Sequence, residues 1–119
     1  MSRLGIVMLV AATTLAGGSA SARTVYDGRW SVVIITDRGT CDRAYRYSID
    51  IRNGIVHYDG DVVDMSGRVA SNGAVRVTVS RGGQSASGHG RLGRSYGTGT
   101  WSGLGTGETC SGRWEAERR

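Results

Sequence analysis

The sequence contains no proline, no phenylalanine and no lysine, and only two cysteines among its 119 residues. Collagen-like chains, proline-rich linkers and small cysteine-dense scaffolds are therefore excluded. Glycine is abundant, with 20 residues, and every one of the 15 basic residues is arginine. Against 10 acids these arginines leave a net charge of +5, which favours solubility and anionic partners but does not determine a fold.

Residues 1–22 have the three parts of a secretory signal peptide. A short positive start that ends at Arg3 is followed by the apolar residues 4–16 and by the small-residue cleavage site Ala20-Ser21-Ala22. The apolar run is too short for a membrane-spanning helix, which needs about 20 residues. No cysteine lies directly after this apolar run, which disfavours a lipid anchor. We expect a periplasmic or extracellular (secreted) protein whose residues 23–119 form one all-β domain.

Export also decides the reading of the two cysteines. Cys41 and Cys110 match no zinc-binding spacing, and an oxidising compartment favours a disulfide between them. The bridge would close a loop of about 70 residues and stabilise the fold by about 4 kcal/mol in the chain-entropy model.

Alternation of apolar and polar residues recurs between turn signals, which is typical of β-strands. The run that ends at Ile51 is followed by Asn53-Gly54, which favours a two-residue hairpin turn. This turn would place Ile51 opposite Val56 and Ile49 opposite Tyr58. All four side chains would then share one face.

The next two turns can be tested by the same criterion. A three-residue loop at 71–73 would place Met65 opposite Val79, and a turn at Gly82-Gly83 would place Val79 opposite Ala86. The three turns agree on one inner face, which a slip of one residue in any of them would destroy.

Strands at residues 28–36, 96–102 and 109–117 would bring the total to eight, and we expect an eight-stranded antiparallel up-and-down β-barrel. The first and last strands of such a barrel run antiparallel, which brings Cys41 close to Cys110. A two-sheet β-sandwich with the same strand order is the alternative.

The loops differ in length between the two ends of this barrel. Tight turns and both termini lie at one end, whereas residues 37–43, 59–62, 81–83 and 103–108 form longer loops at the other. Binding residues concentrate on long loops held by a rigid frame. We therefore predict a ligand-binding site at the long-loop end, formed by Trp101, Arg38, Asp42 and Arg81.

Tryptophan and glycine bear on the barrel interior. Trp30 and Trp114 are expected to pack in the core, and Trp101 could line a mouth. Glycines at 88, 90, 97, 99 and 112 are expected on the inner face. A filled interior is favoured over a small ligand cavity, because protein interiors are close-packed.

The predicted registers place Arg68, Arg76 and His89 side by side on the outer face. Like charges directly opposite are unfavourable unless an acid or a bound anion compensates them. The row is either a solvated surface or an anion patch that contacts phosphate or carboxylate groups of an envelope component such as lipopolysaccharide. Nucleic acid is disfavoured because the chain is expected to be exported and its charge is modest.

Catalysis has little support in the sequence. His57 would lie opposite Asp50, but no serine or cysteine nucleophile is placed beside this pair. A cross-strand ion pair between His57 and Asp50 is therefore the favoured interpretation. The alternative is a hydrolase in which this pair acts on a bound substrate. We predict no enzymatic activity, no cofactor and no metal site.

Gly28-Arg29-Trp30, Gly99-Thr100-Trp101 and Gly112-Arg113-Trp114 resemble the G-x-W signature of the calycin group, which includes lipocalins, avidins and small bacterial protease inhibitors. The resemblance implies a small barrel with a ligand site. In avidin-type chains two tryptophans spaced like Trp101 and Trp114 line that site.

The leading hypothesis is a secreted or periplasmic, non-enzymatic binding protein for a protein or small ligand. A calycin-type protease or hydrolase inhibitor is one alternative, in which residues 23–27 would act as the inhibitory arm. A structural or anion-binding protein of the cell envelope is another.

Overall fold

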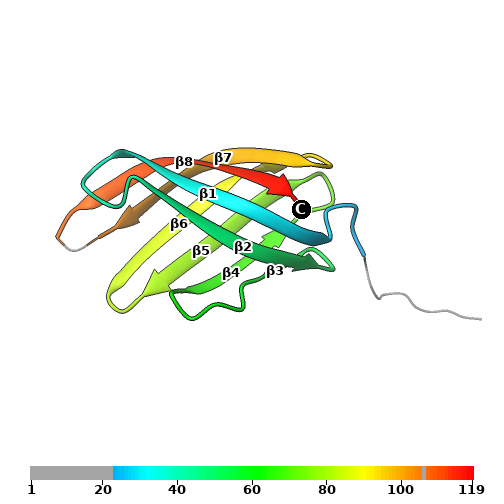
Figure 1. Ribbon diagram of the computed structural model, residues 1–119, viewed down its shortest axis with the longest axis horizontal. Coiled ribbons are helices and arrows are strands. Elements are labelled where there is room, and N and C mark those ends of the chain that lie inside the picture. The colour runs from blue at the N-terminus through cyan, green and yellow to red at the C-terminus, as the bar shows by residue number, and fades with distance from the viewer. Residues whose placement is uncertain (1–22, 106) are drawn as a thin grey trace, which may run out of the picture.

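The computed structural model describes residues 23–105 and 107–119, so the predicted signal peptide lies outside the described residues. Each strand pairs antiparallel with the next, and β1 pairs with β8, so the sheet closes into a barrel (Figure 1). The predicted eight-stranded antiparallel barrel is confirmed and the sandwich alternative is excluded. The strands are β1 (Gly28–Arg38), β2 (Ala44–Arg52), β3 (Ile55–His57), β4 (Asp64–Val69), β5 (Ala74–Arg81), β6 (Gln84–Leu92), β7 (Tyr96–Leu104) and β8 (Thr109–Arg118).

The turn residues set the strand registers as the sequence predicts. Asn53 and Gly54 both have positive φ, at 54° and 77°, as the predicted two-residue turn requires. Ile51 lies opposite Val56, and the registers predicted from the two following turns are also confirmed.

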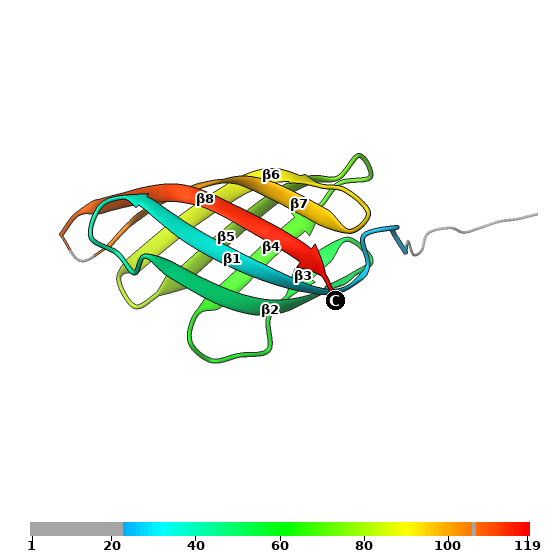
Figure 2. The same cartoon turned by 45° about the horizontal axis from the view of Figure 1, so that its top comes forward.

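One predicted pair is wrong: Tyr58 does not lie opposite Ile49, because β3 already ends at His57. The Tyr58 ring instead packs edge-on against Tyr47, with ring centroids 5.4 Å apart. Beyond the short β3, the loop between β3 and β4 swings out from the barrel wall at the long-loop end (Figure 2).

The N-terminal segment closes the tight-turn end, which we call the floor. Trp30 is fully buried there, and its Nε1 donates a hydrogen bond to the carbonyl of Tyr26 at 2.8 Å. The Arg118 guanidinium lies 4.8 Å from the Trp30 ring centroid and donates to the carbonyl of Asp27 at 2.7 Å. The Asp27 carboxylate accepts hydrogen bonds from the main-chain N–H groups of Asn53 and Gly54.

The predicted disulfide between Cys41 and Cys110 is present and ties the β1–β2 loop to the start of β8. Cys110 is almost fully buried. The main chain passes close to it at Gly39, where φ is +93° and a Cβ would lie 2.6 Å from the Cys110 Sγ. The described part of the chain includes no helix long and apolar enough to span a membrane.

Candidate functional site: a cavity inside the barrel

The inward-facing side chains become more exposed from the floor toward the long-loop end. On β5, Val75 is 7% exposed, whereas Val77 and Val79 are only half-buried. On β2, exposure rises from 1% at Ile51 to 39% at Tyr45. The barrel is therefore sealed at the floor and open at the other end, which we call the mouth.

A cavity of about 590 Å³ occupies the interior behind this mouth. Pockets that hold small molecules commonly have volumes of about 300–1,000 Å³. Most lining residues are apolar, among them Val32, Ile34, Ile49, Met65, Val77 and Val79. The expectation of a filled interior is wrong, although Trp114 and Leu92 occupy the space beside the glycine-rich wall of β6 and β7.

The Trp114 ring occupies the space where side chains of two residues in this wall, Gly90 and Gly99, would project. A Cβ at Gly90 would lie 2.6 Å from Cζ2 of the Trp114 ring, and one at Gly99 would lie 2.5 Å from its Cε2. The indole Nε1 donates to the carbonyl of His89 at 3.2 Å. The ring thus lies against the backbone of β6 and β7, and only glycine leaves room for it. The space on the mouth side of this ring stays open.

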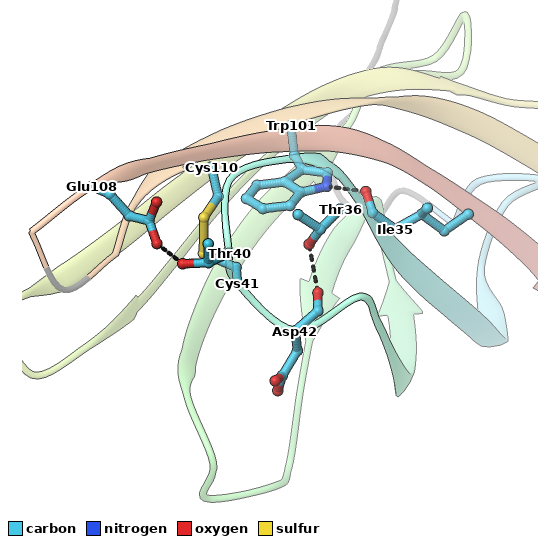
Figure 3. The surroundings of a disulfide bond; sticks show 8 residues. All are labelled: Ile35, Thr36, Thr40, Cys41, Asp42, Trp101, Glu108 and Cys110. Carbon is cyan, nitrogen blue, oxygen red and sulfur yellow. Dashed lines mark hydrogen bonds between the residues drawn. A yellow bond between two sulfur atoms is a disulfide. The ribbon is translucent and has the colours of Figure 1, made fainter.

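Trp101 lines the cavity at the mouth, beside the disulfide (Figure 3). Its Nε1 donates to the carbonyl of Ile35 at 2.9 Å. That carbonyl lies where a Cβ would project from Gly112, so the absence of a side chain there permits the contact. The Trp101 ring is therefore held in place while remaining only half-buried.

Three of the four predicted ligand-binding residues line the cavity: Trp101, Asp42 and Arg81. Arg38 does not line it. A bulge between Thr36 and Arg38 interrupts the strand alternation and pairs Arg38 with Ser111, next to the inward-facing Gly112. The sequence pattern gave no sign of this bulge.

Further polar and aromatic residues of the mouth were not among the predicted site. The Thr40 hydroxyl donates a hydrogen bond to the Glu108 carboxylate, which adds a second link beside the disulfide between the β1–β2 and β7–β8 loops (Figure 3). The rings of Tyr45 and Tyr47 pack at a tilt of 38°, with their centroids 4.8 Å apart. Burial raises the pKa of the Tyr47 phenol, and the neighbouring Tyr45 and Tyr58 act in the same direction. Tyr45 and Tyr47 alternate along β2 on the same face as Ile49 and Ile51, and all four line the cavity.

The mouth is acidic although the protein as a whole is basic. Residues 37–43, 58–64, 81–84 and 104–109 carry six carboxylates and three guanidinium groups, a net charge of −3. One carboxylate, Asp37, accepts two hydrogen bonds from Arg113, at 2.9 and 3.0 Å, which lowers the pKa of Asp37. The field at the mouth favours neutral or cationic ligands over anionic ones.

His57 and Asp50 lie opposite each other, as the Asn53-Gly54 turn predicted. The Asp50 carboxylate, however, accepts hydrogen bonds from Arg29 at 3.1 and 3.4 Å, which lower its pKa. No hydrogen bond joins it to His57 in residues 23–105 and 107–119, so Asp50 does not orient the imidazole. Those residues also contain no cluster of three or more histidine, cysteine or acidic side chains suited to a metal ion.

Arg68, Arg76 and His89 occupy directly opposed positions on β4, β5 and β6. All three side chains are exposed on the outer face, away from the cavity. The predicted row is thus formed, and it belongs to a surface separate from the mouth.

No protein-family model matches the chain, and neither the curated proteins nor the solved structures include a match to it.

Proposed function

We propose that this protein is an exported, non-enzymatic binding protein that takes up a small, mainly apolar, neutral or cationic ligand through the mouth of its barrel. The observation that carries the proposal is the cavity of about 590 Å³, which is lined largely by apolar side chains and sealed at the floor. A dry apolar cavity of about 150 Å³ already binds benzene, so the volume available here suffices for a larger molecule.

The organisation of the mouth supports this assignment. Binding is strongest where the site is formed before the ligand arrives, because little ordering is then required. The disulfide and the Trp101–Ile35 hydrogen bond hold two sides of the mouth in place. The disulfide also fits an oxidising compartment, and the G-x-W motifs fit a calycin-like ligand binder.

The inhibitor alternative is less well supported. An arm that enters a protease cleft must be free to leave the barrel, but Val25, Tyr26 and Asp27 are all hydrogen-bonded to the floor. Thr24 is bonded to Asp27 through both its hydroxyl and its main-chain carbonyl, so of the described residues of the proposed arm, 23–27, only Arg23 lies outside these contacts.

The test uses the neutral apolar dye N-phenyl-1-naphthylamine, whose fluorescence increases in apolar surroundings. We expect saturable binding at one site per barrel. Val79→Trp fills the cavity near the mouth and should weaken binding tenfold or more. Thr78→Trp adds the same ring to the outer face of the same strand and should leave binding unchanged.

Unsaturable binding to the unmodified protein, or equal loss in both variants, would contradict the proposal. Native mass spectrometry of protein purified from its own source would identify any natural ligand that the cavity retains.

A further inference from the structure

Charge is segregated along the barrel axis. The floor end comprises residues 23–29, 50–55, 68–76, 89–96 and 117–119, which carry nine arginines and three side-chain carboxylates, a net charge of +6. The mouth, by contrast, has a net charge of −3. Figure 1 shows the carboxyl terminus at the end of the barrel where β1 begins. The last two residues of the chain are arginines.

Few of these arginines are neutralised. In residues 23–105 and 107–119, carboxylates pair with only two of the nine, Arg29 and Arg52, which share Asp50 at 3.1 and 3.9 Å. Arg68 and Arg76 lie directly opposite each other without a carboxylate partner in this part of the chain. Opposed like charges destabilise a sheet unless an external anion compensates them.

Exposed apolar side chains accompany the arginines at the floor end. Val25 is 54% exposed, Ile55 38% and Tyr96 48%. Ile55 lies directly opposite Arg68, and Tyr96 follows the turn that contains Arg94. Aromatic side chains are enriched at membrane–water interfaces, and anionic lipid surfaces attract arginine.

We propose that the floor end docks on the surface of an anionic phospholipid bilayer, with Arg68, Arg76 and His89 at lipid phosphates and Ile55 and Tyr96 at the headgroup boundary. The mouth then faces the aqueous side, where ligand can enter. Charge complementarity selects the anionic surface, and the exposed apolar residues favour a bilayer over a soluble polyanion. This proposal does not depend on the identity of the cavity ligand.

The test is co-sedimentation of the purified, oxidised protein with vesicles of equal parts phosphatidylglycerol and phosphatidylcholine. Vesicles of phosphatidylcholine alone serve as the neutral reference. We expect binding only to the anionic vesicles, and weaker binding at physiological salt, where the screening length is about 8 Å. Arg76→Gln should weaken binding about fivefold, because an arginine near an anionic surface contributes about 1 kcal/mol.

The matched control is Arg43→Gln, which removes one exposed arginine from the mouth end and should change binding less than twofold. Ile55→Ser with Tyr96→Ser should reduce the binding that remains at physiological salt. Circular dichroism of each variant establishes that the barrel is folded. Equal binding to neutral vesicles, or equal losses in Arg76→Gln and Arg43→Gln, would overturn the proposal.

Hydrogen exchange on the vesicles tests the orientation. The amides of residues 52–56 and 92–97 should be protected, and those of the mouth loop at 58–63 should not. Protection of the mouth loop would overturn the orientation. Binding to heparin without binding to vesicles would replace the bilayer with a soluble polyanion as the partner.

Discussion

The indole of Trp101 on β7 reaches the main-chain carbonyl of Ile35 on β1, with 2.9 Å between Nε1 and the oxygen. β8 lies between these two strands, and its Gly112 is opposite both Trp101 and Thr36. The Ile35 carbonyl lies where a side chain at 112 would project. One glycine thus permits a hydrogen bond that links three strands at the mouth.

The first prediction concerns this contact. Trp101→Phe keeps an aromatic ring but removes the donor, and should lower the free energy of unfolding by about 1–2 kcal/mol. Gly112→Ala should lower it further, because the new Cβ displaces the carbonyl. Since both changes remove the same hydrogen bond, the double variant should lose less than the sum of the single losses. Guanidinium denaturation measures all three, and strictly additive losses would contradict the link.

The second prediction concerns the glycines beneath Trp114. Gly99→Ala should destabilise the barrel by about 1–3 kcal/mol, because its methyl group would overlap both the main-chain carbonyl of His89 and the Trp114 ring. Gly83→Ala is the control, since a Cβ there meets no atom within 4 Å. It should change stability by less than about 0.5 kcal/mol. Equal effects of the two changes in thermal denaturation would show that neither the His89 carbonyl nor the Trp114 ring requires glycine at 99.

The third prediction concerns the disulfide. Replacing Cys41 and Cys110 by alanine should lower the free energy of unfolding by about 2–4 kcal/mol, because the unfolded chain is no longer closed into a large loop. A reducing agent should destabilise the unmodified protein by a similar amount and leave the double-alanine variant unaffected. A reductant effect on that variant would point to a cause other than the bridge.

The fourth prediction concerns pH and Asp27. Desolvation raises the pKa of the Asp27 carboxyl, but hydrogen bonds from Thr24 and from the main chain of Asn53 and Gly54 outweigh it and lower the pKa overall. The stabilisation is therefore present above the ordinary aspartate pKa of about 3.9 and is lost as the pH falls through the lower folded value.

Asp27→Asn should consequently reduce stability at neutral pH and flatten the loss of stability on acidification. Thr24→Val, which removes one of the donors, should fall between this variant and the unmodified protein. Denaturant midpoints measured across the acidic range provide the comparison. An Asp27→Asn variant with an unchanged acid slope would mean that other carboxyls dominate acid unfolding.

Most of the barrel was predictable because short glycine-containing sequences specify its turns. Asn53-Gly54 and Gly82-Gly83 determine loop length, and loop length determines which residues face each other. Once Ile51 is paired with Val56, alternation places every other residue of β2 on a known face. Three such turns sufficed to predict one inner face. Because the number of strands is even, the first and last strands run antiparallel, and this places Cys41 beside Cys110.

The end of β3 was not predictable in the same way. Tyr58 continues the alternating pattern, but β3 ends before it, and its ring packs edge-on against Tyr47. The bulge that redirects Arg38 lies in the pairing of β1 with β8, where the β1 main chain passes close to Gly112. Neither contact partner is near in sequence.

The sequence by itself determined the strand count, the registers at three hairpin turns, the disulfide and the row of Arg68, Arg76 and His89, since these follow from local turns, period-two alternation and the even number of strands. Only the tertiary structure decided that the interior holds a cavity. That outcome depends on how far Trp114 and the other inward side chains reach across a closed sheet, and their volumes fill the floor but not the mouth.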